Sequence, residues 1–197
     1  MNRLTNMLLA SIAFIALLPV MLLIGLGVRV VIGKPILFEQ DRPGLNGKAF
    51  RLFKFRTMRN ATDELGDSLP DADRLTPFGR FLRRTSLDEL PELWNVIVGD
   101  MNLVGPRPLL KEYLPLYTKE QYRRHEVLPG ITGWAQVNGR NRLDWEERLK
   151  LDTWYVDHRS FWLDLKILGL TSLAVFRTHE VSQEGHATSE KFQGREE

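Results

Sequence analysis

Apolar residues are distributed unevenly along the chain, and the longest uninterrupted run lies near the amino terminus. No charged side chain occurs between residues 7 and 28, and a helix needs about 20 apolar residues to cross the hydrocarbon core of a bilayer. A signal peptide is the alternative, but its apolar region is shorter, and no small-x-small cleavage site precedes Arg29. The pattern therefore predicts a helix that is embedded in a membrane.

A proline and the flanking charges indicate how this helix lies in the bilayer. Pro19 removes one backbone hydrogen bond and clashes with the preceding turn, which predicts a kink. Arg3 precedes the run, and Arg29 and Lys34 follow it; such residues favour the cytoplasmic side. A helix that is broken at Pro19 and returns to the same face satisfies both flanks, whereas a straight span would place the amino terminus outside. In either arrangement the positive charge that follows the run predicts that the main domain lies in the cytoplasm.

Beyond this run the pattern changes to shorter elements. Aromatic and branched residues at 36–41 and 49–58 flank a loop with a proline and two glycines, which predicts a β-hairpin. Apolar and basic side chains alternate in the second run, so we expect a basic face directed toward a ligand or lipid. Ser86 and Glu89 match a capping box. Apolar residues at helical spacing predict helices over residues 77–84, 86–98, 110–127, 144–156 and 162–176.

Composition narrows the possible chemistry. The 197 residues are 43% apolar, which suffices for one domain with an anchor, and they include no cysteine, which excludes disulfides, iron-sulfur clusters and thiolate zinc sites. The four histidines lack ligand spacing, and neither a P-loop nor a G-x-S-x-G motif occurs. Basic clusters instead suit nucleic acid, anionic lipid headgroups or phosphorylated small molecules. They comprise Arg42, Lys48, Arg51, Lys54, Arg56 and Arg59, and then Arg80, Arg83 and Arg84.

Two adjacent carboxylates, Asp88 and Glu89, lie in the segment SLDELPEL at the first turn of a predicted helix. Acidic residues there offset the helix dipole and cap free amides, which is one explanation. The other is catalysis, because an aspartate can attack a phosphoryl group to give an acyl phosphate, and Mg²⁺ held by carboxylate and substrate oxygens would relieve the repulsion between anions. Asp71 and Asp73 have the D-x-D spacing of metal-dependent glycosyltransferases, but so short a pattern recurs by chance.

Two further segments are suited to holding a ligand. Arg107 lies between two prolines that stiffen the backbone, and its guanidinium fork matches phosphate oxygens; a rigid turn with an exposed arginine is the alternative. Residues 129–140 read PGITGWAQVNGR, in which three glycines allow the backbone to approach a ligand closely. The polar contacts expected there are Gln136, Asn138 and Arg140.

These segments resemble those of the monotopic phosphoglycosyl transferases, also called bacterial sugar transferases. The matching blocks follow the family order and cover nearly the whole chain. They are FEQDRPG at 38–44, KFRTM at 54–58, SLDELPEL at 86–93, GDMNLVGPRP at 99–108 and the segment at 129–140. The tail, with EG at 184–185 and TSEKFQG at 188–194, is similar to that of small single-domain members, including the type that transfers phospho-bacillosamine. One departure is Leu18 before Pro19, where the family's re-entrant helix usually carries serine.

The resemblance implies an α+β, mostly helical fold, with a β-hairpin and amphipathic interfacial helices around a small catalytic domain. The expected parts are a re-entrant membrane helix at 1–33, a cytoplasmic catalytic domain at 34–180 and a polar tail at 181–197. The expected location is the cytoplasmic face of a bacterial inner membrane.

The resemblance also implies an enzyme that transfers a sugar 1-phosphate from a UDP-sugar to undecaprenyl phosphate and releases UMP, in bacterial glycoconjugate assembly. Asp88 would be the nucleophile of a covalent phosphosugar-aspartyl intermediate and would bind Mg²⁺, and Glu89 would be its partner in a dyad. The positions that bind phosphate and nucleotide-sugar in the family correspond to Lys54, Arg83, Arg107 and Arg140.

Several alternatives stay open. The carboxylates could hold Mg²⁺ for a one-step transfer through a ternary complex, or the chain could be a non-catalytic membrane-surface scaffold or lipid-binding module. Nucleic acid is not an expected partner, because no recognised binding motif accompanies the basic clusters. The sequence names neither the oligomeric state nor the sugar, for which UDP-linked diacetylated bacillosamine and N-acetylated hexosamines are candidates by resemblance.

Overall fold

The computed structural model describes residues 1–60, 69–139, 143–176 and 192–194. Most of these residues lie in helices, and a smaller number lie in short strands. This confirms the predicted α+β, mostly helical fold class. The first elements are α1 (Arg3–Val31), β1 (Leu37–Pro43), the 3-10 helix η1 (Leu45–Gly47), β2 (Ala49–Phe55), α2 (Asp71–Arg74), α3 (Pro77–Thr85), the 3-10 helix η2 (Leu87–Glu89) and α4 (Glu92–Val98). They are followed by β3 (Asn102–Val104), the 3-10 helix η3 (Lys111–Leu116), α5 (Lys119–Tyr122), the 3-10 helix η4 (Arg123–His125), β4 (Gly130–Thr132), α6 (Trp134–Val137), α7 (Trp145–His158) and α8 (Phe161–Phe176).

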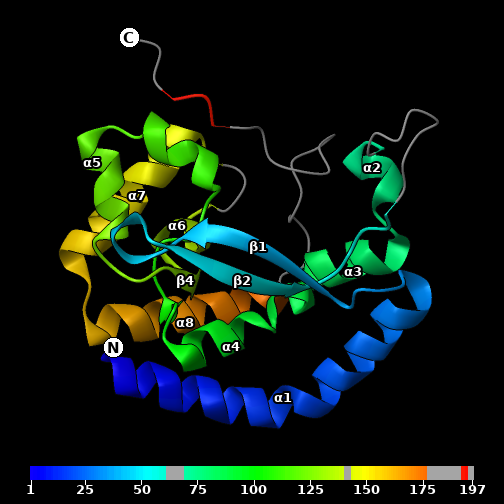
Figure 1. The fold of residues 1–197 in the computed structure, drawn as a ribbon. Coiled ribbons are helices and arrows are strands. Elements are labelled where there is room, and N and C mark those ends of the chain that lie inside the picture. The colour runs from blue at the N-terminus through cyan, green and yellow to red at the C-terminus, as the bar shows by residue number, and fades with distance from the viewer. Residues whose placement is uncertain (61–68, 140–142, 177–191, 195–197) are drawn as a thin grey trace.

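The long helix along the lower edge of Figure 1 is α1, and its axis bends along its length. Asn2 caps it, because its side-chain oxygen accepts a hydrogen bond from the Thr5 amide at 2.8 Å. Helical structure continues through Pro19, so the proline does not end the helix. Among the described residues, α1 is the helix that is long and apolar enough to cross a membrane.

Both halves of α1 pack against the same domain. Near its start, Ala10 lies in a buried cluster with Leu93. Near its end, Val28 lies in a second cluster with Phe55 and Leu82. The helix therefore runs beside the domain along its whole length, and its other face presents apolar side chains outward, which suits contact with lipid. These exposed side chains include Leu4, Leu8, Ile12, Ile15, Leu22, Leu23, Leu26 and Val30.

The predicted hairpin is confirmed. Strands β1 and β2 are antiparallel, and Leu37 lies opposite Phe55 at the open end. The turn contains Asn46 and Gly47 with φ of 55° and 73°, a left-handed conformation that these two residue types tolerate. The second strand ends at Phe55, so the predicted run of 49–58 is three residues too long.

A single helix over 110–127 is a prediction that the structure contradicts. The segment consists of η3, α5 and η4. Pro115 lies inside η3 and lacks the amide that an α-helix needs, and Thr118 starts a new helix with a capping box. The parallel pair of β3 and β4 was not predicted, because strands of three residues carry no readable alternation.

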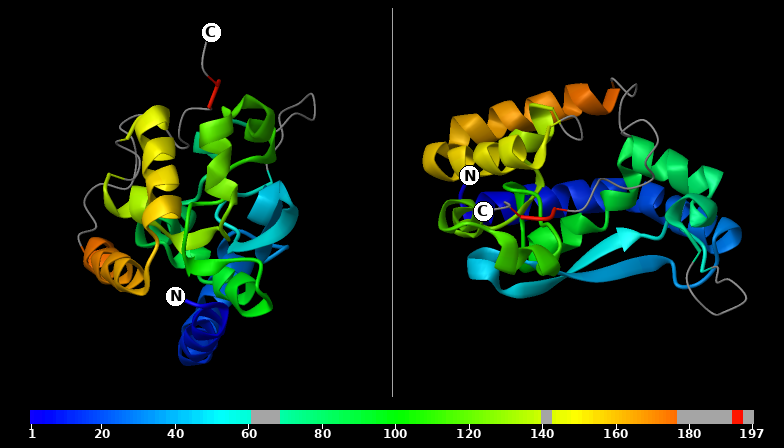
Figure 2. Two further views of the ribbon diagram at one scale, coloured as in Figure 1. Left: turned by 90° about the vertical axis from the view of Figure 1, so that its left-hand side faces the viewer. Right: turned by 90° about the horizontal axis from the view of Figure 1, so that it is seen from above.

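Figure 2 shows how these elements surround the centre of the molecule. The hairpin lies on one side, α7 and α8 lie on the opposite side, and α1 runs beneath them. A cluster of Val104, Val127, Tyr155 and Ile167 joins the β3 segment to α7 and α8. The short connections between α3 and α4 and after β3 therefore meet the hairpin above α1.

Candidate active site

A tight connection between α3 and α4 carries Asp88 and Glu89. Helix α3 ends at Thr85, and the residue that follows and caps it, Ser86, has a φ of 56°, the left-handed conformation of a helix end. The chain then forms η2, and α4 begins at Glu92. The capping box predicted at Ser86 is wrong, because this residue terminates the preceding helix and makes no side-chain cap hydrogen bond. The two carboxylates therefore lie on a separate turn.

Cations from different elements converge on this turn. Lys54 comes from β2, Arg107 from the loop after β3, and Arg83 from the last turn of α3. The Lys54 Nζ atom lies 2.7 Å from Glu89 Oε1, although the two residues are 35 positions apart. The Arg83 Nε donates to Thr57 Oγ1 at 3.0 Å. The structure thus brings together five of the predicted site residues, namely Lys54, Arg83, Asp88, Glu89 and Arg107.

Glu89 is engaged by two of these cations. Arg107 donates to it from both Nη atoms, with Nη1 at 3.4 Å from Oε2, and Lys54 approaches the same carboxylate. Burial raises the pKa of Glu89, but Arg107 and Lys54 outweigh burial and lower the pKa. In turn, Glu89 raises the pKa of Arg107. Glu89 is therefore an ionised group that holds both cations in place.

Glu92 is a third carboxylate of the site. Its side chain is 2% exposed, and its Oε1 atom lies 3.1 Å from Lys54 Nζ. Burial raises the pKa of Glu92 to about 7; Lys54 opposes this shift and Glu89 adds to it. Lys54 therefore bridges one carboxylate that stays ionised and one that titrates near neutral pH.

Asp88 differs from both other carboxylates. It is 8% exposed, yet among the described residues its carboxylate makes no ion pair or hydrogen bond, in contrast to Glu89 and Glu92. Burial, and then the charge of Glu89, raise the pKa of Asp88, while the surrounding cations lower it. A carboxylate that is surrounded by cations but not bound to them is available to an incoming group.

This donor set suits Mg²⁺ together with a phosphate ligand. In the parts of the chain that the structure describes, no group of three or more metal-binding side chains occurs, and Asp71 of the D-x-D segment pairs with Arg74. Mg²⁺ in enzymes is usually held by one or two carboxylates, waters and substrate phosphates. Asp88 fits that arrangement as a single carboxylate whose oxygens are not occupied by other described residues.

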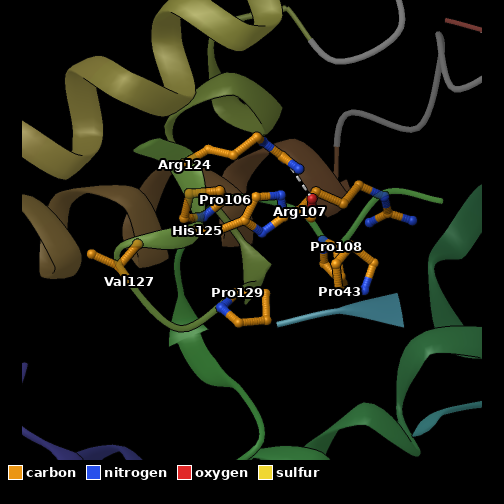
Figure 3. Close-up of a pocket in the computed structure, with 8 residues that line it drawn as sticks. All are labelled: Pro43, Pro106, Arg107, Pro108, Arg124, His125, Val127 and Pro129. Atoms are coloured by element: carbon orange, nitrogen blue, oxygen red, sulfur yellow. Dashed lines mark hydrogen bonds between the residues drawn. The ribbon is translucent and has the colours of Figure 1, made fainter. Parts of the chain in front are cut away.

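The loop that presents Arg107 is held in place by contacts with Arg124 and with neighbouring backbone. Arg124 donates from Nη2 to the carbonyl oxygen of Arg107 at 2.6 Å, the bond that is dashed in Figure 3. Arg124 is buried and pairs with Asp152 of α7, with Nη2 at 2.7 Å from Oδ2. Close backbone packing adds to this, because a Cβ atom on Gly130 would lie 2.0 Å from the amide nitrogen of Gly105. Arg107 therefore projects from a rigid loop.

Two of the three glycines of residues 129–140, Gly130 and Gly133, pack against backbone, whereas a Cβ atom on Gly139 would meet the side chain of Leu143. All three were expected to admit a ligand, but Gly133 lies against Gly105, so that a Cβ atom on it would be 2.1 Å from the Gly105 carbonyl oxygen. Gly130 and Gly133 therefore support the Arg107 loop through backbone contact, and contact of this segment with a ligand stays a prediction. Arg140 lies outside the described residues, and its role stays a prediction.

Three residues of this arrangement were missed from the sequence. Glu92 follows Glu89 by three positions, a spacing that places two side chains on one face of a helix, so a signal was available. For Arg124 and Asp152 there was no signal, because the two are 28 positions apart on different elements.

The fold and the site together define a protein class, in which a charged cluster of carboxylates and basic residues lies above an apolar amino-terminal helix. Residues 1–178 match the family model described as bacterial sugar transferase. The chain belongs to the bacterial sugar transferase family and is therefore a transferase.

Relatives in this family differ in length. The uncharacterized sugar transferase EpsL of Bacillus subtilis (strain 168) is 59% identical over 167 residues, which are 85% of this chain and 83% of EpsL. UDP-glucose:undecaprenyl-phosphate glucose-1-phosphate transferase of Xanthomonas campestris pv. campestris is 43% identical over 186 residues, covering 88% of this chain and 38% of that protein. Undecaprenyl-phosphate galactose phosphotransferase of Salmonella typhimurium is 39% identical over 162 residues, covering 74% and 34%. The chain thus spans most of EpsL but less than two fifths of the two longer relatives.

Proposed function

We propose that this chain transfers a sugar 1-phosphate from a UDP-sugar to undecaprenyl phosphate and releases UMP, a membrane step of bacterial glycoconjugate assembly. Two relatives are named for sugar-phosphate transfer to undecaprenyl phosphate, and one of these uses UDP-glucose. The observation that carries the proposal is the pairing pattern of the dyad. Glu89 holds Lys54 and Arg107, while Asp88 is buried beside it without a direct partner among the described residues.

In this proposal Asp88 is the nucleophile. One of its oxygens attacks the phosphorus that carries the sugar, and the bond from this phosphorus to the oxygen between the two phosphates breaks. That oxygen leaves with UMP, and the sugar phosphate remains on Asp88 as an acyl phosphate. Lys54 and Arg107, which Glu89 orients, offset the charge of the phosphate oxygens. Mg²⁺ held by Asp88 and the diphosphate would neutralise further charge.

The second step uses the lipid. An oxygen of undecaprenyl phosphate attacks the same phosphorus, the bond to Asp88 breaks, and the carboxylate is restored. The products are the lipid diphosphate sugar and the free enzyme. A lipid phosphate lies at the membrane surface, and the exposed apolar face of α1 beneath the domain supports a site at that level.

We also propose that α1, within residues 1–33, enters and leaves the bacterial inner membrane by its cytoplasmic face, with residues 34–180 in the cytoplasm. The packing of both halves of α1 against one domain supports this, because a straight span would separate its ends by about 30 Å of hydrocarbon. The chain has no cysteine, so Asn2→Cys gives a single label site. An impermeant thiol reagent should reach it in inverted vesicles; labelling from outside intact cells would contradict this topology.

Trapping of the intermediate tests the reaction. The protein in nanodiscs is incubated, without lipid acceptor, with a UDP-sugar that is labelled in the sugar-bearing phosphate. We expect covalent labelling and release of UMP, and we expect Asp88→Asn to lose both. The matched control is Asp41→Asn, which neutralises an exposed carboxylate of the hairpin and should retain both.

Each other outcome selects an alternative. Full release of UMP by Asp88→Asn would remove Asp88 from the mechanism. Turnover with lipid but without protein labelling would support one-step transfer in a ternary complex, and no turnover of any UDP-sugar would support a scaffold or lipid-binding module. A panel with UDP-glucose, UDP-galactose, UDP-N-acetylhexosamines and UDP-diacetylbacillosamine, scored by release of UMP, identifies the donor.

A further inference from the structure

Arg42 lies at the end of β1, beside the loop that presents Arg107. The next residue, Pro43, lines a small pocket together with Arg107, and Figure 3 shows it beside Pro108. The backbone is fixed here, because the Nδ1 atom of His125 lies 3.2 Å from the carbonyl oxygen of the residue after Pro43. The end of the hairpin is therefore held against the Arg107 loop.

The guanidinium of Arg42 is incompletely partnered. Its Nη2 donates to the neutral Oε1 of Gln40 at 2.6 Å, and its Nε is buried without a hydrogen-bond partner among the described residues. Burial lowers the pKa of Arg42, and the like charge of Arg107 lowers it further, against the attraction of nearby acidic groups such as Glu92. Arg42 is half-buried, and a cation with a buried donor that lacks a partner costs free energy that a bound anion would offset.

We propose that Arg42 and Arg107 together bind the phosphate of UMP, both within the UDP-sugar and as the leaving group. This inference rests on the proposed function. Arg107 directs part of its fork at Glu89, but its side chain is 41% exposed, so further donor positions stay accessible to a ligand. A second guanidinium beside it would complete a two-cation clamp, and such planar forks match phosphate oxygens.

The order of charges in the site indicates which phosphate the clamp takes. Asp88 interacts with Lys54, Arg107 and Arg83 as its main cations. Arg42 lies opposite Phe50 in the hairpin, four positions nearer the turn than Lys54, and Lys54 is the cation that binds Glu89 next to Asp88. Arg42 is therefore farther along the hairpin from Asp88, and the charge of Arg107 acts on it. Asp88 attacks the sugar-bearing phosphate in the proposed reaction, and the neighbouring phosphate of UMP then falls between the two arginines.

This position has a chemical consequence. When the bond from the sugar-bearing phosphorus to the bridging oxygen breaks, the electron pair leaves with that oxygen, and the phosphate of UMP gains a negative charge. Two guanidiniums at that oxygen stabilise the charge as it develops. Arg42 would thus act on departure of UMP and not on the later transfer to the lipid.

Calorimetric binding of UMP to the full-length protein in nanodiscs tests the inference. In Arg42→Gln we expect the affinity for UMP to fall by about tenfold or more, because a charge-assisted hydrogen bond to the phosphate is lost. The affinity for uridine, which lacks the phosphate, should not change. The control is Arg51→Gln, which removes an exposed arginine from the opposite strand of the same hairpin and should bind UMP within about twofold of the wild type.

Wild-type affinity for UMP in Arg42→Gln would overturn the inference. An equal loss of affinity for uridine would also overturn it, because it would indicate that the substitution distorts the site of the nucleoside. If Arg42→Gln does not fold, Arg42→Lys keeps the charge without the fork and should weaken UMP binding by about threefold or more; unchanged binding would again overturn it. In Arg42→Gln that carries the labelled sugar phosphate on Asp88, undecaprenyl phosphate should remove the label at the wild-type rate. Slower discharge with unchanged UMP binding would reassign Arg42 to the lipid phosphate and reject our assignment. Failure of the proposed function shows separately, as absence of covalent labelling in the wild type.

Discussion

The buried pair of Arg124 and Asp152 provides a test of how the fold positions Arg107. The two side chains are 1% and 3% exposed, and Arg124 donates to Asp152 Oδ2 from Nε at 3.1 Å and from Nη2 at 2.7 Å. Asp152→Asn keeps the shape of the side chain but leaves the cation of Arg124 buried without its counter-charge. Such a loss costs about 3–5 kcal/mol, and the free energy of unfolding should fall by that amount.

The same substitution should reduce activity in the protein that remains folded. Arg124 also holds the carbonyl oxygen of Arg107 at 2.6 Å, so a displaced Arg124 shifts the loop that carries the guanidinium. A misplacement of about 1 Å at a reacting centre costs roughly 100-fold in rate. Release of UMP per folded molecule should therefore fall together with stability.

Denaturation in detergent micelles, followed by tryptophan fluorescence, measures the stability change. The control is Asp157→Asn on the same helix, because Asp157 pairs with Arg123 at the surface, where the side chains are 45% and 33% exposed. Removing an exposed pair should cost about 0–1 kcal/mol. Equal losses in the two variants would refute the reasoning.

A paired apolar replacement separates stability from positioning. Burial raises the pKa of Asp152 despite its partner, so attraction does not fully offset the cost of removing the charge from water. Arg124→Met combined with Asp152→Leu should therefore recover most of the lost stability. Activity should stay low, because the bond to Arg107 is still missing. Recovery of full activity would show that this bond does not position the loop.

Two further predictions concern backbone packing and pH. Gly130→Ala should destabilise the protein by about 1–3 kcal/mol in thermal unfolding, because its Cβ atom would lie 2.0 Å from the Gly105 nitrogen. The control is Gly169→Ala, where the added atom meets nothing within 4 Å. Equal melting temperatures of the two variants would contradict the prediction. Burial lowers the pKa of His125 from 6.5 to about 4, so the folded state prefers the neutral ring. Its contribution to stability is present above pH 6.5 and is lost as the pH falls toward 4, by up to about 3 kcal/mol. His125→Gln should flatten the pH dependence of unfolding in this window, and an unchanged slope would argue against the neutral ring.

Local patterns in the sequence were enough to predict several parts of this protein. The apolar run predicted α1, and alternation around a turn predicted the hairpin that carries Lys54. Short segments with unusual chemistry indicated Asp88, Glu89 and Arg107 as site residues. Each of these signals depends on residues within about one element, so it can be read without knowledge of the fold.

The tertiary structure alone decided how these residues are paired and supported. Lys54 is shared by two carboxylates, Asp88 is left without a direct partner among the described residues, and Arg124 holds Arg107 from behind. It also packed two of the glycines that suggested a ligand loop, Gly130 and Gly133, against the backbone of Gly105. These features depend on contacts between distant positions, and burial then sets the charge state of each group. The sequence determined which groups are present at the site, and only their packing determined which carboxylates are paired with cations.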